Sequence, residues 1–164
     1  MSTAPAVLLA HEQLLQEIEP RAELLVAMRT PLNVAWRVLT WRLAVLSVAK
    51  CQEDTKAAAE ILGLSTLTVR DLRREPAEMY TRVRTDKAEP YALDAAQRDA
   101  IERAAVEFVA AGTRYGEACR MFELAMIHAA LRLENGNHAA TARRLDVHEN
   151  TVWNKLRRAK GGAA

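Results

Sequence analysis

The side chains best suited to chemistry lie near the C-terminal end of the chain, and they are basic. Between Asn137 and Lys160 the sequence has six lysine or arginine residues and two acidic residues, a net charge of +4. The six are Arg143, Arg144, Lys155, Arg157, Arg158 and Lys160. The whole chain carries a net charge of only +2, so the positive charge is local. Such a cluster suits the phosphate backbone of a nucleic acid, although a solvated helix face has the same composition.

Other reactive or ligating sites lack support in the sequence. His138 and His148 have no cysteine or acidic residue at a spacing useful for a metal ion. No glycine-rich phosphate loop, nucleophile elbow or paired-carboxylate motif occurs. Cys51 and Cys119 also lack metal-type spacing, and we expect both to be reduced and packed. We therefore predict no metal, no cofactor and no enzymatic activity.

The basic residues surround a predicted helix-turn-helix. Asn135-Gly136-Asn137 combines a helix stop with a helix N-cap, which predicts a short helix over 139–145. Asp146-Val147-His148 predicts a turn, and a second helix follows over 149–158. Ala142 is small enough for the two helices to cross there. This combination of two short helices and a tight turn is typical of a helix-turn-helix.

The segment resembles the DNA-binding end of the Fis family, a domain that also closes the enhancer-binding activators of bacteria. The resemblance is carried by Gly136, Asn137, Thr141, Ala142, Leu145, Val147 and the run Asn150-Thr151-Val152-Trp153-Asn154-Lys155-Leu156. Asp146 stands where the family usually has glycine, and Glu149 where it usually has a basic or polar residue. The family often carries an aromatic residue at Trp153, which implies packing on the scaffold rather than stacking on a base.

Composition favours an all-α protein. Half of the 164 residues are hydrophobic, with only six glycines and five prolines, which is typical of one compact helical domain or two small ones. No run approaches the roughly 18 consecutive apolar residues of a membrane span, and the apolar N-terminus is no signal peptide. We expect a cytoplasmic protein with no membrane partner.

Hydrophobic periodicity predicts further helices before this motif. They lie over 11–29, 32–51, 56–62, 66–74, 93–111 and 113–134. The short pair over 56–62 and 66–74 follows Asp54, a good N-cap, and is joined by Gly63-Leu64-Ser65. This pair is a second predicted helix-turn-helix.

The two halves of the chain align without gaps when shifted by 83 residues. The alignment gives 14 identities over the 57 positions from 18 to 74, including Ile18 with Ile101 and Leu62 with Leu145. Two generic amphipathic stretches would need gaps and would not keep the turns in register. We therefore predict an internal duplication with the following bounds. Fis-like unit one spans 8–75 with its helix-turn-helix over 54–74, a linker spans 76–90, and unit two spans 91–164 with its motif over 137–158.

The resemblance also implies how the units pair. Fis-family proteins pair two chains through their longer helices into a four-helix core. Here the helices over 32–51 and 113–134 are too apolar to face solvent, so we expect them to pack together with 11–29 and 93–111 outside. We predict an intramolecular pseudo-dimer, and further oligomerisation stays open.

In the DNA-binding interpretation each unit places its second short helix in a major groove. The candidate residues of unit two are Asn137, His138, Arg143, Arg144, His148, Asn150, Thr151, Asn154, Lys155, Arg157 and Arg158. Those of unit one are Thr55, Lys56, Ser65, Thr66, Thr68, Arg70, Arg73 and Arg74. Unit one has a net charge of only +1 from Asp54 to Arg74, so the units should differ in affinity.

Two functions follow from these features. The first is a bacterial transcription regulator or small nucleoid-associated factor of Fis type that binds duplex DNA through both motifs. The second is a Fis-like module that binds a transcription activator or an RNA polymerase subunit without reading DNA. Asp71, Glu149, the Asp146 turn and the weak overall charge favour the second.

Overall fold

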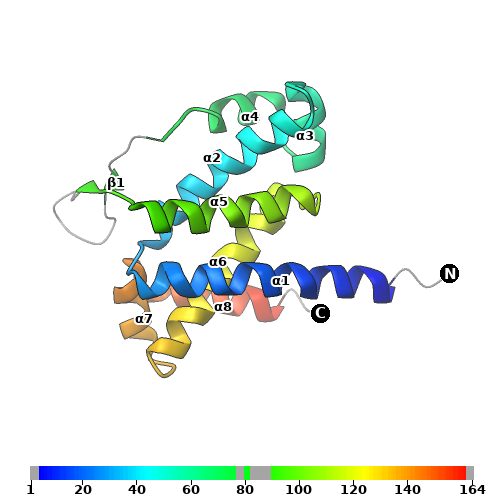
Figure 1. Cartoon of the computed structure of the whole chain (residues 1–164). Coiled ribbons are helices and arrows are strands. Elements are labelled where there is room, and N and C mark those ends of the chain that lie inside the picture. Colours follow the sequence, from blue (N-terminus) through cyan, green and yellow to red (C-terminus); the bar gives the residue numbers. More distant parts are fainter. Residues whose placement is uncertain (1–3, 77–79, 82–89, 162–164) are drawn as a thin grey trace.

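The computed structural model describes residues 4–76, 80–81 and 90–161. Within these ranges the chain forms eight helices and one pair of two-residue strands (Figure 1). The elements are α1 (Ala4–Ala27), α2 (Leu32–Lys50), α3 (Thr55–Leu62), α4 (Thr66–Leu72), β1 (Tyr80–Thr81), β2 (Pro90–Tyr91), α5 (Ala95–Ala110), α6 (Tyr115–Leu133), α7 (His138–Leu145) and α8 (Glu149–Gly161). The predicted all-α class is confirmed.

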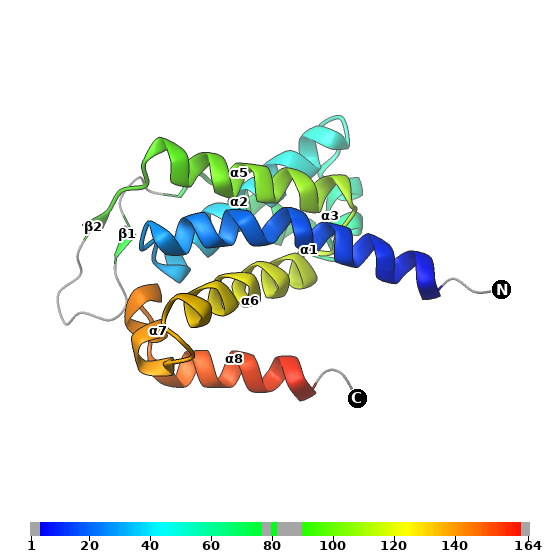
Figure 2. The same cartoon turned by 60° about the horizontal axis from the view of Figure 1, so that its bottom comes forward.

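Four long helices, α1, α2, α5 and α6, form the core. The main partner of α1 is α6 and the main partner of α5 is α2, while α1 also packs on α5 and α2 on α6 (Figures 1 and 2). The largest fully buried side chains come from all four helices: Ile18, Leu25, Leu39, Leu43, Ile101, Phe108, Phe122 and Met126. Each long helix therefore buries its apolar face chiefly against the other half of the chain.

The helix-turn-helix pairs lie at opposite ends of this core (Figure 1). In the second pair, Ala142, Leu145 and Val152 belong to the main hydrophobic cluster. In the first pair, Leu62 and Val69 pack with Val48 of α2 in a smaller, separate cluster. The second motif is thus part of the main core, whereas the first sits on the end of α2.

Helix boundaries recur at a constant offset along the chain. The bounds of α2 and α3 reappear 83 residues later in α6 and α7, and the starts of α4 and α8 differ by the same number. Within the described ranges, every residue with positive φ also has a counterpart at this offset. The pairs are Arg29 and Gly112, Gln52 and Asn135, Glu53 and Gly136, and Gly63 and Asp146. The two halves therefore turn at matching positions.

Two helices are longer than the sequence predicts. Helix α1 begins at Ala4 rather than His11, because alanine and leucine in this stretch are good helix formers. Helix α8 runs to Gly161 rather than ending at Arg158. The other predicted helices are confirmed to within two residues at each end.

The predicted linker over 76–90 contains β1 and the first residue of β2. β1 and β2 run antiparallel, with Tyr80 opposite Tyr91 and Thr81 opposite Pro90. Sequence reasoning did not predict these strands, because two residues are too few to show an alternating pattern. Residues 77–79 and 82–89 of the linker lie outside the described part of the chain.

A buried glutamine fastens the start of α5 to the end of α1. Gln97 forms a reciprocal capping box with Asp94. Its Nε2 donates to the hydroxyls of Thr30, at 2.8 Å, and Tyr91, at 2.7 Å. These bonds satisfy a polar side chain that is only 3% exposed and fix the point where the second half of the chain enters the core.

Helix α2 is long and apolar enough to cross a membrane by length and composition alone. Its apolar character has another explanation, because 56% of the segment is buried against other helices. Leu39, Leu43 and Ala44 are all fully buried or nearly so. The apolar residues of α2 therefore belong to the protein core, as the sequence predicts for this helix.

The left-handed turns at Gly63 and Asp146 should respond in opposite ways to substitution. Asp146 adopts a left-handed conformation, with φ 55° and ψ 45°, and its Oδ2 is buried with no hydrogen-bond partner in the described part of the chain. Asp146→Gly should raise the free energy of unfolding in urea by about 1 kcal/mol, since glycine adopts this conformation without strain.

The matched control is Gly63→Ala at the corresponding turn, where φ is 68°. This change should lower the free energy of unfolding by about 1 kcal/mol or more. If Asp146→Gly and Gly63→Ala changed the free energy of unfolding equally and in the same direction, backbone strain at positive φ could not explain the two turns.

Candidate nucleic-acid interface

The second helix-turn-helix is built from local hydrogen bonds. The side chain of Asn137 accepts from the backbone N–H of Ala140 at 3.0 Å, which caps α7. At the turn, the N–H of Val147 donates to the carbonyl of Ala142 at 3.0 Å, across the left-handed Asp146. The N-cap, the left-handed turn and the small crossing residue are all as the sequence predicts. Together they set the angle at which α8 leaves the core.

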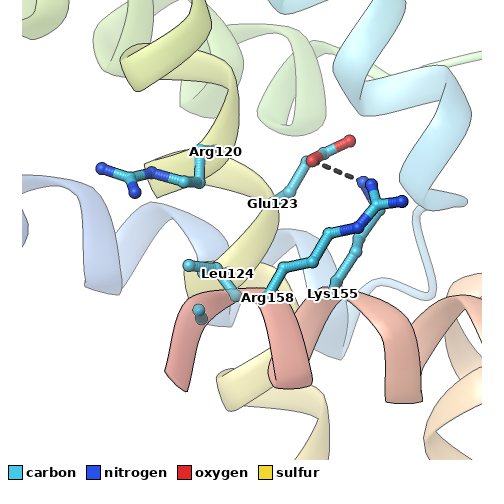
Figure 3. Close-up of a pocket in the computed structure, with 6 residues that line it drawn as sticks. Arg120, Glu123, Leu124, Lys155 and Arg158 are labelled. Atoms are coloured by element: carbon cyan, nitrogen blue, oxygen red, sulfur yellow. Dashed lines mark hydrogen bonds and ion pairs between the residues drawn. The ribbon is translucent and has the colours of Figure 1, made fainter. Parts of the chain in front are cut away.

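An ion pair fastens α8 to the scaffold. Lys155 Nζ lies 2.6 Å from a carboxylate oxygen of Glu123 on α6, and both side chains are mostly buried. Figure 3 shows this contact in a pocket between α6 and α8, which Arg158 and Arg120 also line. Lys155 was a candidate for DNA contact, but here its charge is engaged by Glu123. Its role in the structure is to hold the helix.

Arg144 has a similar position in α7. Its guanidinium pairs with Glu134 at the end of α6, and its Nη1 donates to the carbonyl of Val26 in α1 at 3.4 Å. The side chain is only 16% exposed. Arg144 therefore joins α7 to two helices of the core, although it too was a candidate for DNA contact.

The remaining basic residues of the motif face solvent. Arg143, Arg157, Arg158 and Lys160 are exposed, and within the described ranges none has an acidic partner within 4.0 Å. Arg157 donates to the side-chain oxygen of Asn154 at 3.1 Å, which positions it along the outer face of α8. Four unpaired cations at one end of the molecule leave a local positive potential.

The other candidates of unit two divide by exposure. Asn137, His148, Asn150 and Asn154 are exposed, whereas His138 and Thr151 are half-buried. Asn150 and Asn154 lie four residues apart and so share the outward face of α8. The structure thus brings Asn150, Asn154, Arg157 and Arg158 together on one helix, with Arg143 on the neighbouring helix.

Trp153 occupies one flank of α8. Its ring stacks on the imidazole of His138, with centroids 4.1 Å apart and planes 10° from parallel. Even so, 53% of Trp153 remains exposed. The expected packing of Trp153 on the scaffold is therefore made through one histidine of α7. Sequence reasoning missed this pair, because its members lie 15 positions apart on different helices.

The first helix-turn-helix has the same backbone features with different side chains. Asp54 caps α3, Gly63 has a left-handed backbone, and Ser65 caps α4 by accepting from the N–H of Thr68 at 3.1 Å. Its candidates Lys56, Ser65, Thr68, Arg70, Arg73 and Arg74 are exposed, and Thr55 and Thr66 are half-buried.

The charge of this first motif is largely compensated. Arg73 pairs with Glu53 at 3.2 Å and Arg74 with Asp71 at 3.8 Å. Leu67, at the position that corresponds to Asn150, is 67% exposed. We did not single out Leu67 from the sequence, although its 83-residue offset from Asn150 could have identified it. An apolar side chain here reduces the capacity of α4 to contact bases.

Among the described residues, no group of three or more His, Cys, Asp or Glu side chains could hold a metal ion. Both cysteines are free, and Cys119 is buried. Burial raises the pKa of the Cys119 thiol to about 11, so this thiol is protonated at neutral pH and a poor nucleophile.

The two arginines of α7 give a matched stability test. Arg144→Ala removes a partly buried ion pair and should lower the free energy of unfolding by about 1–2 kcal/mol. Arg143→Ala, at an exposed neighbouring position, should change it by less than about 0.5 kcal/mol. Chemical denaturation of both variants measures this difference, and similar losses in the two would contradict the structural role of Arg144.

The comparisons with known proteins agree with the geometry of this motif. The family described as bacterial regulatory protein, Fis family, matches residues 118–158, which cover most of α6, all of α7 and most of α8. No curated protein and no solved structure matches the chain significantly. The matched segment is about a quarter of the chain. Residues 118–158 are therefore similar to the bacterial regulatory proteins of the Fis family.

Proposed function

We propose that this protein is a bacterial transcription regulator or nucleoid-associated factor that binds duplex DNA through α7 and α8. The observation that carries the proposal is the Fis-family match over 118–158, on a motif whose Arg143, Arg157 and Arg158 are exposed and have no acidic partner within 4.0 Å among the described residues. In this reading α8 enters the major groove, with Asn150 and Asn154 toward the base edges. The arginines contact phosphates on either side.

The chain also works as an intramolecular pseudo-dimer of two duplicated units. Support comes from the 83-residue offset shared by helix bounds and left-handed residues. The packing is reciprocal as well, since α1 lies on α6 and α5 lies on α2. Exchanging the two halves leaves this pattern of neighbours unchanged, as expected for a two-fold arrangement. A single chain then supplies two helix-turn-helix motifs without a second subunit.

The two motifs contribute unequally to DNA binding. In α3–α4 the cations Arg73 and Arg74 are paired with carboxylates, and Leu67 replaces the outward asparagine. We assign the stronger, base-reading contact to α7–α8. The exposed Lys56, Ser65, Thr68 and Arg70 of the first motif then add a weaker contact with the backbone. DNA as the partner implies a protein of the bacterial cytoplasm, associated with the nucleoid.

The second candidate function is a protein-interaction module that binds a transcription activator or an RNA polymerase subunit. The exposed Leu67 and Ile61 on the first motif favour it, because large apolar side chains at an otherwise polar surface mark contact sites. A partner protein whose capture survives nuclease treatment would support this candidate. A footprint with two adjacent half-sites would exclude it as the main function.

Salt-dependent DNA binding tests the main proposal. The parent protein should bind duplex DNA with an affinity that falls steeply between 50 and about 200 mM salt, because released counterions drive binding. Arg157→Ala combined with Arg158→Ala should reduce the slope of log K against log salt by about 2, roughly one for each phosphate contact removed. Fluorescence anisotropy with labelled duplexes measures both quantities.

The matched control is Arg73→Ala combined with Arg74→Ala in the first motif. Since both arginines are already paired with carboxylates, this variant should change the slope by clearly less. Absence of salt-sensitive binding by the parent protein would reject the DNA proposal. Equal loss in the two double variants would reject the unequal roles of the motifs.

A further inference from the structure

An apolar groove lies beside the predicted DNA-binding face, between α6, α7 and α8. Its volume is about 570 Å³, within the range of about 300–1,000 Å³ that small-molecule sites occupy. Leu131 and Leu156 contribute aliphatic surface, and Trp153 stacked on His138 contributes an aromatic wall. Arg157 and Lys160 from α8, both exposed, and His128 from α6 also line the groove. The groove is therefore mostly apolar with a basic rim.

Three side chains around the groove, Trp153, His138 and Lys160, keep exposed surface or polar atoms that the described part of the chain does not satisfy. More than half of Trp153 is exposed, although its indole could be buried by a partner in the groove. The Nδ1 atom of His138 is buried and has no hydrogen-bond partner among the described residues. Lys160 also lacks an acidic partner within 4.0 Å in the described part of the chain. A buried polar atom without a partner calls for a ligand or a bound water molecule.

These features are not general properties of the helix-turn-helix. In the first motif, at the 83-residue offset, Thr55 stands in place of His138 and Arg70 in place of Trp153. Arg73 stands in place of Leu156. The first motif keeps the backbone turn but lacks the aromatic pair and the leucine. The groove therefore depends on side chains specific to the second motif.

We propose that this groove binds a small amphipathic carboxylate, a molecule with an apolar chain or ring and one negative charge. The apolar part would lie on Leu131, Leu156 and the exposed face of Trp153, where its burial is favourable. The carboxylate would pair with Arg157, whose planar guanidinium suits two parallel hydrogen bonds, and with Lys160. Charge complementarity with this basic rim selects an anion over a neutral molecule of the same shape.

The site is coupled to the proposed DNA function through Arg157. In that function, on which this part of the inference rests, Arg157 contacts a phosphate of the DNA backbone. A carboxylate bound to the same guanidinium removes this contact and adds a negative charge beside α8. Ligand binding then weakens DNA binding. DNA binding weakens ligand binding by the same factor, because the two equilibria are thermodynamically linked.

The test uses the intact chain and three probes: decanoate, the neutral alcohol decanol, and acetate, which is an anion without the apolar chain. Decanoate should shift the indole N–H resonance of Trp153 in a nitrogen–proton NMR spectrum, and the other two should shift it weakly. The Trp153 signal is assigned with Trp153→Phe. Arg157→Gln should weaken decanoate binding about tenfold, the loss expected for a hydrogen bond to a charged group.

Arg74→Gln is the matched control, because Arg74 is the counterpart of Arg157 in the first motif. It should leave decanoate affinity unchanged. Circular dichroism checks that both variants keep their helices, as expected for exposed positions. The proposal would be overturned if decanol bound as tightly as decanoate. It would also be overturned if Arg157→Gln and Arg74→Gln weakened decanoate binding equally.

A DNA-binding measurement in the presence of decanoate distinguishes a failure of the carboxylate site from a failure of the proposed DNA binding. Saturating decanoate should raise the Kd for duplex DNA of the parent protein but not of Arg157→Gln. If decanoate binds and DNA binding does not change, the coupling is wrong and the carboxylate site stands. If the parent protein binds no DNA, the proposed function fails, and the NMR titration still decides the ligand site.

Discussion

The structure depends on reciprocal packing between the two halves of the chain. Helix α1 buries its apolar face mainly on α6, and α5 buries its own mainly on α2. The fully buried Ile18 and Phe108 belong to this shared core rather than to either half. Hydrophobic burial is the dominant favourable term in folding, so each half needs the other for most of its stability. Both helix-turn-helix motifs take their positions from this core.

Local chemistry then determines what each motif presents to solvent. In the second motif, Glu123 pairs with Lys155 of α8, and Glu134 pairs with Arg144 of α7. These two ion pairs hold the helices on the core and leave the outer arginines exposed to solvent. In the first motif the carboxylates lie on the surface and neutralise Arg73 and Arg74 instead. The same backbone can therefore carry a strongly cationic face at one end and a nearly neutral one at the other.

Much of the fold could be predicted from the sequence, because helix caps and turns are local signals. The N-caps Asp54 and Asn137, the left-handed turn at Asp146 and the 83-residue offset were all visible in the residues. The site could be predicted only in part. Which arginine is free and which is paired depends on contacts such as Arg144 with Val26, 118 positions apart. The groove around Trp153 likewise requires three helices to meet, which periodicity does not reveal.

Fragment complementation tests the reciprocal core most directly. Residues 1–81 and 90–164 can be prepared as separate chains, because α1–α4 lie within the first fragment and α5–α8 within the second. Neither fragment alone should fold as a monomer, because its long helices lack their main partners. An equimolar mixture should recover the helical circular dichroism and cooperative unfolding of the intact chain. A stably folded monomer of either fragment, unaffected by adding the other, would contradict the account.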